Sequence, residues 1–222
     1  MISHLALIMD GNRRWAKKRM LMPWLGHRQG VESVQMAIQY CLDQKIPHLS
    51  LYTFSLENFK RSEQEVSYLF SLVREAKERI AEFVKAGVKI RFIGDRTKIP
   101  EDTIAVCDEI EQETVDGALL RCNFLMCYGG QQEIIQAAKS IVEQGLLEVS
   151  MTTFRQHLWL GDIPDPDVII RTGGVKRLSN FLLFQGAYSE IRFLDCLWPD
   201  LTQELLHETI LDCEQAHKNV GK

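Results

Sequence analysis

The sequence has little that would mark a membrane-spanning or nucleic-acid-binding protein. Its first apolar run, Leu5 to Met9, is far shorter than the roughly 20 residues of a spanning helix, and no basic segment of the signal-peptide kind precedes it. Excess positive charge is also lacking, because 26 Lys and Arg stand against 30 Asp and Glu, for a net charge of −4. We therefore expect no nucleic-acid partner, and we expect any membrane contact to be peripheral.

Two further absences concern nucleotides and disulfides. Neither G-x-x-x-x-G-K-[ST] nor G-x-G-x-x-G occurs, so the usual fingerprints of nucleotide binding do not apply. The six cysteines show no C-x-x-C spacing and no small disulfide-rich frame. We expect a reducing cytoplasm as the location, and we interpret Cys122 and Cys127, which lie in an apolar run, as small core residues rather than metal ligands.

What the sequence does contain is an alternation of short apolar runs with longer segments of helical period. This pattern is typical of an α/β domain with a mainly parallel sheet flanked by helices. At 222 residues, 45% of them hydrophobic, and without an evident linker or repeat, the chain is expected to form a single domain over residues 1–222. Six strands are predicted: Leu5–Met9, Leu49–Phe54, Val88–Ile93, Leu119–Met126, Val168–Arg171 and Ile191–Leu194.

Helical periodicity fills the segments between these strands. One amphipathic helix contains Val31 and Leu42, and a second begins at the capping-box pair Ser62 and Glu65 and ends near Gly87. This second helix would be about 24 residues long, enough to wall an elongated pocket beside the sheet. Three more helices are predicted, at residues 100–117, 131–144 and 202–217.

The first candidate site begins at Asp10, where the first predicted strand ends. A buried strand, a tight turn at Gly11 and a helix start follow one another there, which is where open α/β sheets bind ligands. Arg13 and Arg14 offer guanidinium donors for phosphate, and a Mg²⁺ ion would reconcile the Asp10 carboxylate with an anionic ligand. Asp10 and Asn12 could equally cap the helix, and the basic run that continues to residue 19 could be a solvated face.

Polar residues follow two other predicted strands in the same way. Residues 55–61 form a polar, aromatic and cationic cluster, and residues 171–180 combine paired glycines with Arg171, Arg177 and Ser179. The second of these segments could cradle a diphosphate, although either segment alone could be an ordinary surface loop. Because right-handed crossovers bring the carboxyl ends of parallel strands to one side of the sheet, we expect two anion sites and one metal carboxylate to converge.

Six motifs in order along the chain identify the family that this sequence resembles. They are M-D-G-N-R-R-W-A at 9–16, G-H at 26–27, F-S-L-E-N-F-K-R at 54–61, R-T-G-G at 171–174, R-L-S-N-F-L-L at 177–183 and W-P-D at 198–200. Together they resemble the signatures of cis-prenyltransferases of the undecaprenyl diphosphate synthase type. Enzymes of this family join isopentenyl diphosphate to an allylic diphosphate with the help of Mg²⁺.

The resemblance implies roles for the matched residues. Asp10 would be catalytic and hold the magnesium diphosphate, Asn58 has a second catalytic assignment, and Glu190 would be the other metal-site carboxylate. Substrate binding is implied for Gly11, Asn12, Arg13, Arg14, Trp15, His27, Ser55, Leu56, Glu57, Phe59, Arg61, Arg171, Arg177, Leu178 and Ser179. Structural roles stay open as well: Trp15 and Phe59 could be core aromatics, and Glu190 could form a surface salt bridge with Arg192.

The implied reaction suits these residue types. Breaking an allylic C–O bond leaves a carbocation and a diphosphate, whose charge Mg²⁺ and arginines would stabilise, while Trp15 and Phe59 could face the cation. The departing diphosphate could itself be the base. The expected primer is farnesyl diphosphate and the expected product is undecaprenyl diphosphate, the lipid-carrier precursor of cell-wall synthesis. The resemblance also implies a homodimer, and the long product suggests a cytoplasmic enzyme that contacts the inner face of the membrane.

Some positions depart from the family pattern. Pro23 replaces a common arginine, Val175 replaces a common glutamate, Gln131 replaces an arginine, and Asn219 lies in an ending that lacks the arginine of Arg-x-Gly. A paralogue with a shorter or unusual product is therefore one alternative. A non-catalytic partner subunit and a magnesium-dependent phosphotransferase are two others, although the chain keeps its Asp-Gly-Asn motif and lacks a phosphate-loop lysine motif. The missing Asp-Asp-x-x-Asp repeat argues against the trans-prenyltransferases.

Overall fold

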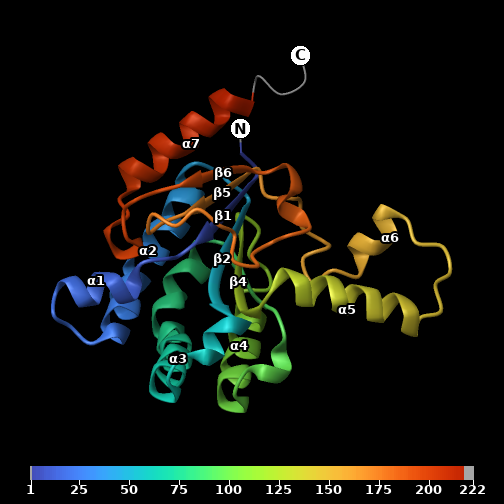
Figure 1. The fold of residues 1–222 in the computed structure, drawn as a ribbon, viewed down its shortest axis with the longest axis horizontal. Coiled ribbons are helices and arrows are strands. Elements are labelled where there is room, and N and C mark those ends of the chain that lie inside the picture. Colours follow the sequence, from blue (N-terminus) through green and yellow to red (C-terminus); the bar gives the residue numbers. More distant parts are fainter. Residues whose placement is uncertain (1, 218–222) are drawn as a thin grey trace.

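The computed structural model describes residues 2–217 of the chain. At its centre is one six-stranded sheet. Its order is β3-β4-β2-β1-β5-β6, and every neighbouring pair is parallel (Figure 1). The predicted fold class is thus confirmed. The strands are β1 His4–Ile8, β2 His48–Ser55, β3 Val88–Ile93, β4 Leu120–Tyr128, β5 Val168–Arg171 and β6 Glu190–Phe193.

The helices are α1 Asn12–Lys18, α2 Pro23–Asp43, α3 Glu63–Lys85, α4 Glu101–Glu113, α5 Gly130–Glu143, α6 Met151–Gln156 and α7 Gln203–His217. Helices α3, α4, α5 and α7 agree with the predicted ones to within about four residues, whereas α2 begins at Pro23, eight residues before Val31, the first residue from which it was predicted. Only α6, a single short helix after the Gly145 turn, was not predicted. No helix in the described part of the chain is long and apolar enough to cross a membrane.

The two faces of the sheet are covered differently. Side chains from α2, α3, α4 and α7 pack with the strands in the larger buried cluster. On the other face, Leu160, Ile163, Phe181 and Leu182 cover the sheet from the irregular segments before and after β5. Helices α5 and α6 extend from the body as an arm in Figure 1, far from α1 and α2. A long cavity lies between helices α2 and α3 on one side and strands β1, β2 and β4 on the other.

Two local features fix the helices that border this cavity. Gly26 lies where α2 crosses α1, and a Cβ there would come within 1.9 Å of the carbonyl oxygen of Asn12, so only glycine allows this approach. The Ser62 hydroxyl caps α3 by accepting a hydrogen bond from the Glu65 amide. The predicted capping box is only half formed, because the carboxylate of Glu65 bonds to Arg61.

Candidate active site

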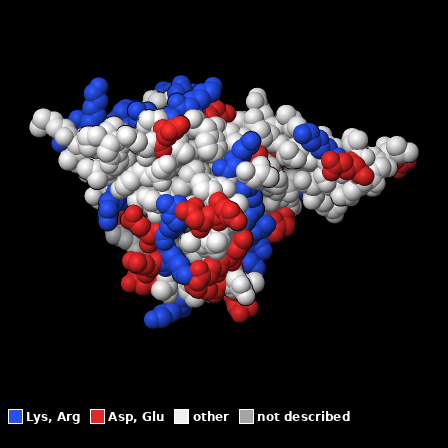
Figure 2. Space-filling model, turned by 90° about the horizontal axis from the view of Figure 1, so that it is seen from below, with Lys and Arg blue, Asp and Glu red and all other residues white. Residues whose placement is uncertain are grey.

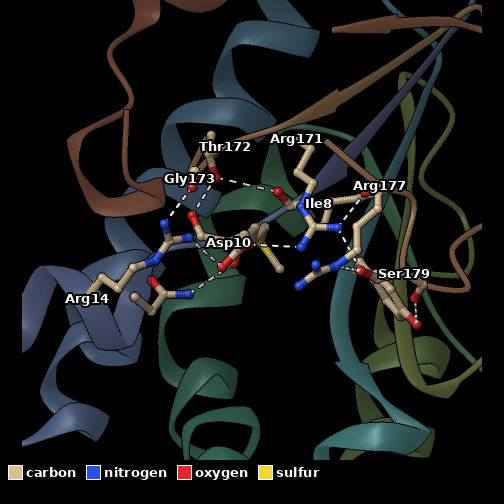
Figure 3. Close-up of polar contacts among 11 residues, drawn as sticks. Ile8, Asp10, Arg14, Arg171, Thr172, Gly173, Arg177 and Ser179 are labelled. Carbon is tan, nitrogen blue, oxygen red and sulfur yellow. Dashed lines mark hydrogen bonds and ion pairs between the residues drawn. The ribbon is translucent and has the colours of Figure 1, made fainter. Parts of the chain in front are cut away.

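The carboxylate of Asp10 lies between two arginines from distant parts of the sequence. Ile8 at the end of β1 pairs in register with Arg171 at the end of β5, so the residues that follow β1 lie beside Arg171. Asp10 Oδ2 accepts a hydrogen bond of 2.9 Å from Arg171, and Oδ1 accepts one of 3.1 Å from Arg14 (Figure 3). The predicted meeting of the first and third clusters is thus observed.

The turn after β5 holds Asp10 in place through its backbone. Thr172 donates its hydroxyl proton to the carbonyl oxygen of Asp10 at 2.7 Å, and Arg14 donates to the carbonyl oxygen of Gly173. Gly173 has φ +88°, and a Cβ there would come within 2.4 Å of the Arg14 guanidinium and 3.1 Å of the Asp10 carbonyl. The turn therefore requires glycine both for its conformation and for its space.

Arg171, Arg177 and Ser179 form a second cationic group next to Asp10. The Ser179 hydroxyl accepts hydrogen bonds from Arg171 at 2.7 Å and from Arg177 at 3.2 Å. Ser179 and Asn180 have positive φ values of 51° and 66°, a backbone cost that is common at ligand sites. Arg171 is buried, and its Nε has no hydrogen-bond partner in the described structure. These donors lie close enough together to bind one phosphate group.

A third group surrounds Glu65, a residue that the sequence analysis treated only as a helix cap. Its buried carboxylate lies 2.9 Å from Arg61, 3.5 Å from His27 and 3.6 Å from Arg13. Hydrogen bonding to His27 and the nearby guanidinium charges lower the pKa of Glu65, while burial lowers the pKa of His27. Glu65 is thus ionised and fixes the orientation of three residues that the resemblance assigns to the substrate.

Two connected cavities meet at these groups. The larger, of about 740 Å³, is lined near Asp10 by Asn58, Arg171 and Arg177, and deeper in by apolar side chains such as those of Leu69, Val73, Ile90, Phe92 and Phe124. The smaller, of about 570 Å³, is lined mainly by Asp10, Asn12, Arg13, Arg14, Lys17, Pro23, His27 and Arg61. Asp10, Asn12, His27 and Arg61 line both. A cationic mouth that continues into an apolar interior fits an amphiphile with an anionic head and a hydrocarbon tail.

The 3₁₀-helix Leu56–Lys60 places the second motif at the rim of the larger cavity. Asn58 accepts a hydrogen bond from the Ser55 amide, so these two residues form a capping box, and both line the cavity. Glu57 also lines it and accepts a hydrogen bond from Asn180, which ties this motif to the turn after β5.

Some predicted substrate residues have other surroundings. The Trp15 indole donates to Asp200 and lies under Arg19, and Phe59 packs edge-to-face on Phe54 at 4.9 Å. Neither ring is among the described residues that line the two cavities, so the structure does not place them facing a carbocation there. Leu56 and Leu178 pack against the two hydrophobic clusters and support the motifs from below.

Within one chain, Glu190 does not share a site with Asp10. Glu190 begins β6 and pairs in register with Val168, the first residue of β5, whereas Asp10 comes two residues after Ile8, which pairs with Arg171, the last residue of β5. The two carboxylates therefore lie at opposite ends of the strands. The Glu190 carboxylate instead pairs with Arg192 at 2.9 Å, the surface salt bridge that the sequence analysis left open.

The residues around Asp10 fit a magnesium ion shared between the protein and a diphosphate. The described residues contain no group of three or more His, Cys, Asp or Glu side chains that could hold a metal by themselves. At this site the protein therefore offers one carboxylate, that of Asp10. Mg²⁺ is often held by one or two carboxylates together with substrate phosphates. Asn12 adds a buried side-chain oxygen that has no hydrogen-bond partner among the described atoms.

Comparisons with known proteins agree with this geometry. Residues 8–221 match the prenyltransferase family of undecaprenyl diphosphate synthases. The isoprenyl transferase of Neisseria meningitidis serogroup B is 36% identical over 99% of this chain and 89% of its own. That of Thermotoga maritima is 40% identical over 98% and 96%.

Solved structures show the same likeness. Lavandulyl diphosphate synthase from Lavandula x intermedia, in complex with dimethylallyl diphosphate, superposes with a TM-score of 0.88 at 30% identity, covering 96% of this chain and 94% of the other. A probable undecaprenyl diphosphate synthase from Campylobacter jejuni gives 0.82 at 34% identity, with coverages of 96% and 95%. Fold and site thus define a prenyltransferase. The chain belongs to the undecaprenyl diphosphate synthase family of isoprenyl transferases.

The departures from the family pattern fall at different places. Pro23 begins α2 and lines the smaller cavity beside Lys17. The backbone amide of Gln131, at the start of α5, donates to the side chain of Asn180 at 2.9 Å. Val175 is half-buried in the turn after β5, and Asn219 lies outside the described residues.

Proposed function

We propose that this protein condenses isopentenyl diphosphate with farnesyl diphosphate, in a Mg²⁺-dependent reaction, to make undecaprenyl diphosphate for cell-wall synthesis. The observation that carries the proposal is the position of Asp10, which lies between two arginines at the mouth of a deep apolar cavity. The anionic head of each substrate would lie at the mouth, and the growing hydrocarbon chain would extend into the cavity.

The hydrogen-bond donors divide into two groups suited to two diphosphates. Arg13 and Arg14, the cations of the first group, line the smaller cavity together with the imidazole of His27, and we assign this cavity to the allylic diphosphate. Arg171 and Arg177, with the Ser179 hydroxyl, would bind isopentenyl diphosphate. The Asp10 carboxylate occupies one donor each of Arg14 and Arg171, and because a guanidinium has five N–H donors, others stay available to a diphosphate.

The reaction breaks the C–O bond of the allylic diphosphate and forms a C–C bond to isopentenyl diphosphate. Negative charge then develops on the leaving diphosphate, where guanidinium groups held in advance stabilise it without reorganisation. A proton leaves the new allylic unit, and we propose the departing diphosphate as the base that takes it. When bound, Mg²⁺ would neutralise diphosphate charge, held by Asp10 and the substrate oxygens. Asn58, at the rim of the larger cavity, keeps its catalytic assignment as a prediction.

A shorter prenyl product is the second candidate. The observation that favours it is the likeness to lavandulyl diphosphate synthase, whose fold superposes over nearly the full length of this chain. A non-catalytic partner subunit is less well supported, because Asp10, Arg171, Arg177 and Ser179 are arranged here as a binding site.

Assembly and location form part of the proposal. We propose a homodimer, which is supported by the exposed apolar side chains of Val142, Leu147 and Met151 on the arm formed by α5 and α6. We propose a cytoplasmic enzyme at the inner face of the membrane, in keeping with its six free cysteines. In a homodimer, Glu190 would have to serve the metal of a site other than the one in its own chain.

The test combines labelled isopentenyl diphosphate with farnesyl diphosphate and Mg²⁺, and separates the products by length. Products ending near undecaprenyl diphosphate are expected. Asp10→Asn keeps the shape of the side chain but removes its charge, so we expect a loss of about 100-fold or more in turnover, and EDTA should stop the reaction. Short products would support the second candidate. A variant as active as the original chain would contradict the role of Asp10.

A further inference from the structure

The turn between α1 and α2 holds three exposed apolar side chains on a molecule that buries most of its others. Met20 is 95% exposed, Met22 52% and Leu21 42%. In Figure 1 this turn lies at the left end of the molecule, and Figure 2 shows that end as white surface with basic side chains around it. Single exposed apolar residues are common on protein surfaces, but three in succession form a contiguous patch of the kind that marks an interaction site.

The backbone holds these side chains outward in a fixed arrangement. Leu21 donates its amide to the carbonyl of Ala16, and Met20 donates to that of Lys17, the pair of hydrogen bonds that ends many helices. Met20 thereby takes the left-handed position, with φ 56°, where glycine is usual because a side chain is strained there. A strained and fully exposed methionine stabilises neither the turn nor the core. Its side chain is therefore available for contact with something outside the chain.

Charge indicates what that partner is. Residues 11–31 contain six Lys and Arg and no Asp or Glu, although the whole chain has a net charge of −4. Lys18 is exposed and has no ion pair among the described residues. Arg19 stacks on Trp15 and pairs with Asp200 at 3.2 Å. The other three arginines are also paired with carboxylates, Arg13 with Glu65, Arg14 with Asp10 and Arg28 with Glu75, so Lys17 and Lys18 carry the positive charge that no ion pair in the described structure offsets. Apolar side chains surrounded by cations are the chemistry of a surface that binds anionic lipid.

We propose that the turn at residues 19–22 inserts its apolar side chains into an anionic lipid surface. The inference rests on the proposed function, because a prenyl diphosphate product must pass to a membrane. Met20 and Leu21 also line the smaller cavity, so the docked surface adjoins the diphosphate site. Binding through this turn brings the mouth of the site to the bilayer without any membrane-spanning segment.

The test measures co-sedimentation of the full chain with phosphatidylcholine vesicles, with and without phosphatidylglycerol, in the absence of substrates. Binding to the anionic vesicles is expected, and it should fall as salt is added. The double variant Met20→Glu with Met22→Glu should weaken binding at least tenfold, because two apolar side chains that would insert into the lipid become charged. Lys18→Ala should weaken it about fivefold.

A matched control is Leu119→Glu, at an exposed apolar residue (66% exposed) in the turn between α4 and β4. This variant should bind as the original chain does. Equal losses in the control and the double variant, equal binding to neutral and anionic vesicles, or no binding at all would overturn the proposal. So would a double variant that changes only the oligomeric state, since the turn would then contact a second copy. Because no substrate is present, catalytic failure would leave this result unchanged.

Discussion

Lys17 is the residue whose position most changes the interpretation of Pro23. The family pattern puts an arginine where Pro23 stands, and the sequence alone suggests that one diphosphate cation is lost. In the structure Lys17 lines the same cavity as Pro23, and its ammonium group has no ion pair among the described residues. We therefore interpret Lys17 as the cation that replaces the missing arginine in binding the allylic diphosphate.

This interpretation predicts different effects for two adjacent lysines. Lys17→Ala should raise KM for the allylic diphosphate about tenfold, the usual size of one charge-assisted hydrogen bond, with kcat little changed. Lys18→Ala is the control, because Lys18 is exposed and lies outside the cavity. Steady-state kinetics in detergent, with isopentenyl diphosphate saturating, measures both. Equal KM values for the two variants would show that Lys17 does not bind the diphosphate.

The sequence predicted well those site residues whose position has a single structural interpretation. Asp10 follows the buried strand β1 and Arg171 ends the buried strand β5, and parallel pairing brings them together. Glu65 was not found, because a glutamate three residues after Ser62 is also what a helix cap requires. Its contacts with His27 and Arg13 depend on how α1, α2 and α3 pack, which no local pattern reveals.

At the scale of elements, His4 joins three segments of the chain. Its Nδ1 lies 2.7 Å from the carbonyl of Pro164, before β5, and so donates the proton, while Nε2 accepts from the hydroxyl of Ser50 in β2. Burial lowers the pKa of His4 to about 4. Between pH about 6.5 and 4 the unfolded chain therefore binds a proton that the folded chain does not, and the free energy of unfolding falls as the pH is lowered.

The predicted effect is about 2 kcal/mol between pH 7.5 and pH 5, the contribution of His4 alone. His4→Gln keeps a donor and an acceptor but does not titrate, so the pH dependence of its unfolding free energy should be smaller by about this amount. Urea unfolding at the two pH values measures it. An unchanged pH dependence would mean that His4 takes up its proton in the folded state at the ordinary pKa.

Helix α3, whose two ends carry sequence signals, was predicted almost to the residue, whereas the periodicity of α2 indicated only the part from Val31 onward of a helix that begins at Pro23. Helix α3 begins after Ser62 and ends before Gly87, as its cap and its left-handed glycine indicate. Helix α6 has six residues, too few for a period to show. The cover of the second face, from Phe181 and Leu182, is irregular backbone whose packing follows from β5 and the turn after it rather than from any repeat.

At the scale of the whole molecule, the sheet determines both the site and the direction of the cavity. The cationic mouth lies at the carboxyl ends of β1 and β5, and the apolar lining continues across β2 to β3 and β4. Three strand spacings separate β1 from β3, or about 14 Å. Phe92 and Phe124 stack on these far strands, with ring centroids 5.5 Å apart. A growing chain that starts at the mouth and extends across the sheet would reach this pair on the far strands.

Removing one of these two rings should therefore lengthen the product. Phe124→Ala removes one of the two rings, and we expect the longest product to gain one or more isoprene units. Product length is a suitable measurement because, unlike turnover, it does not depend on the fraction of enzyme that is folded. The control is Phe154→Ala, which removes a ring of α6 that packs on Phe184 at 5.4 Å and lines neither cavity. If both variants give the original lengths, the stacked pair does not limit the chain, and the limit must come from when the product leaves rather than from the space behind it.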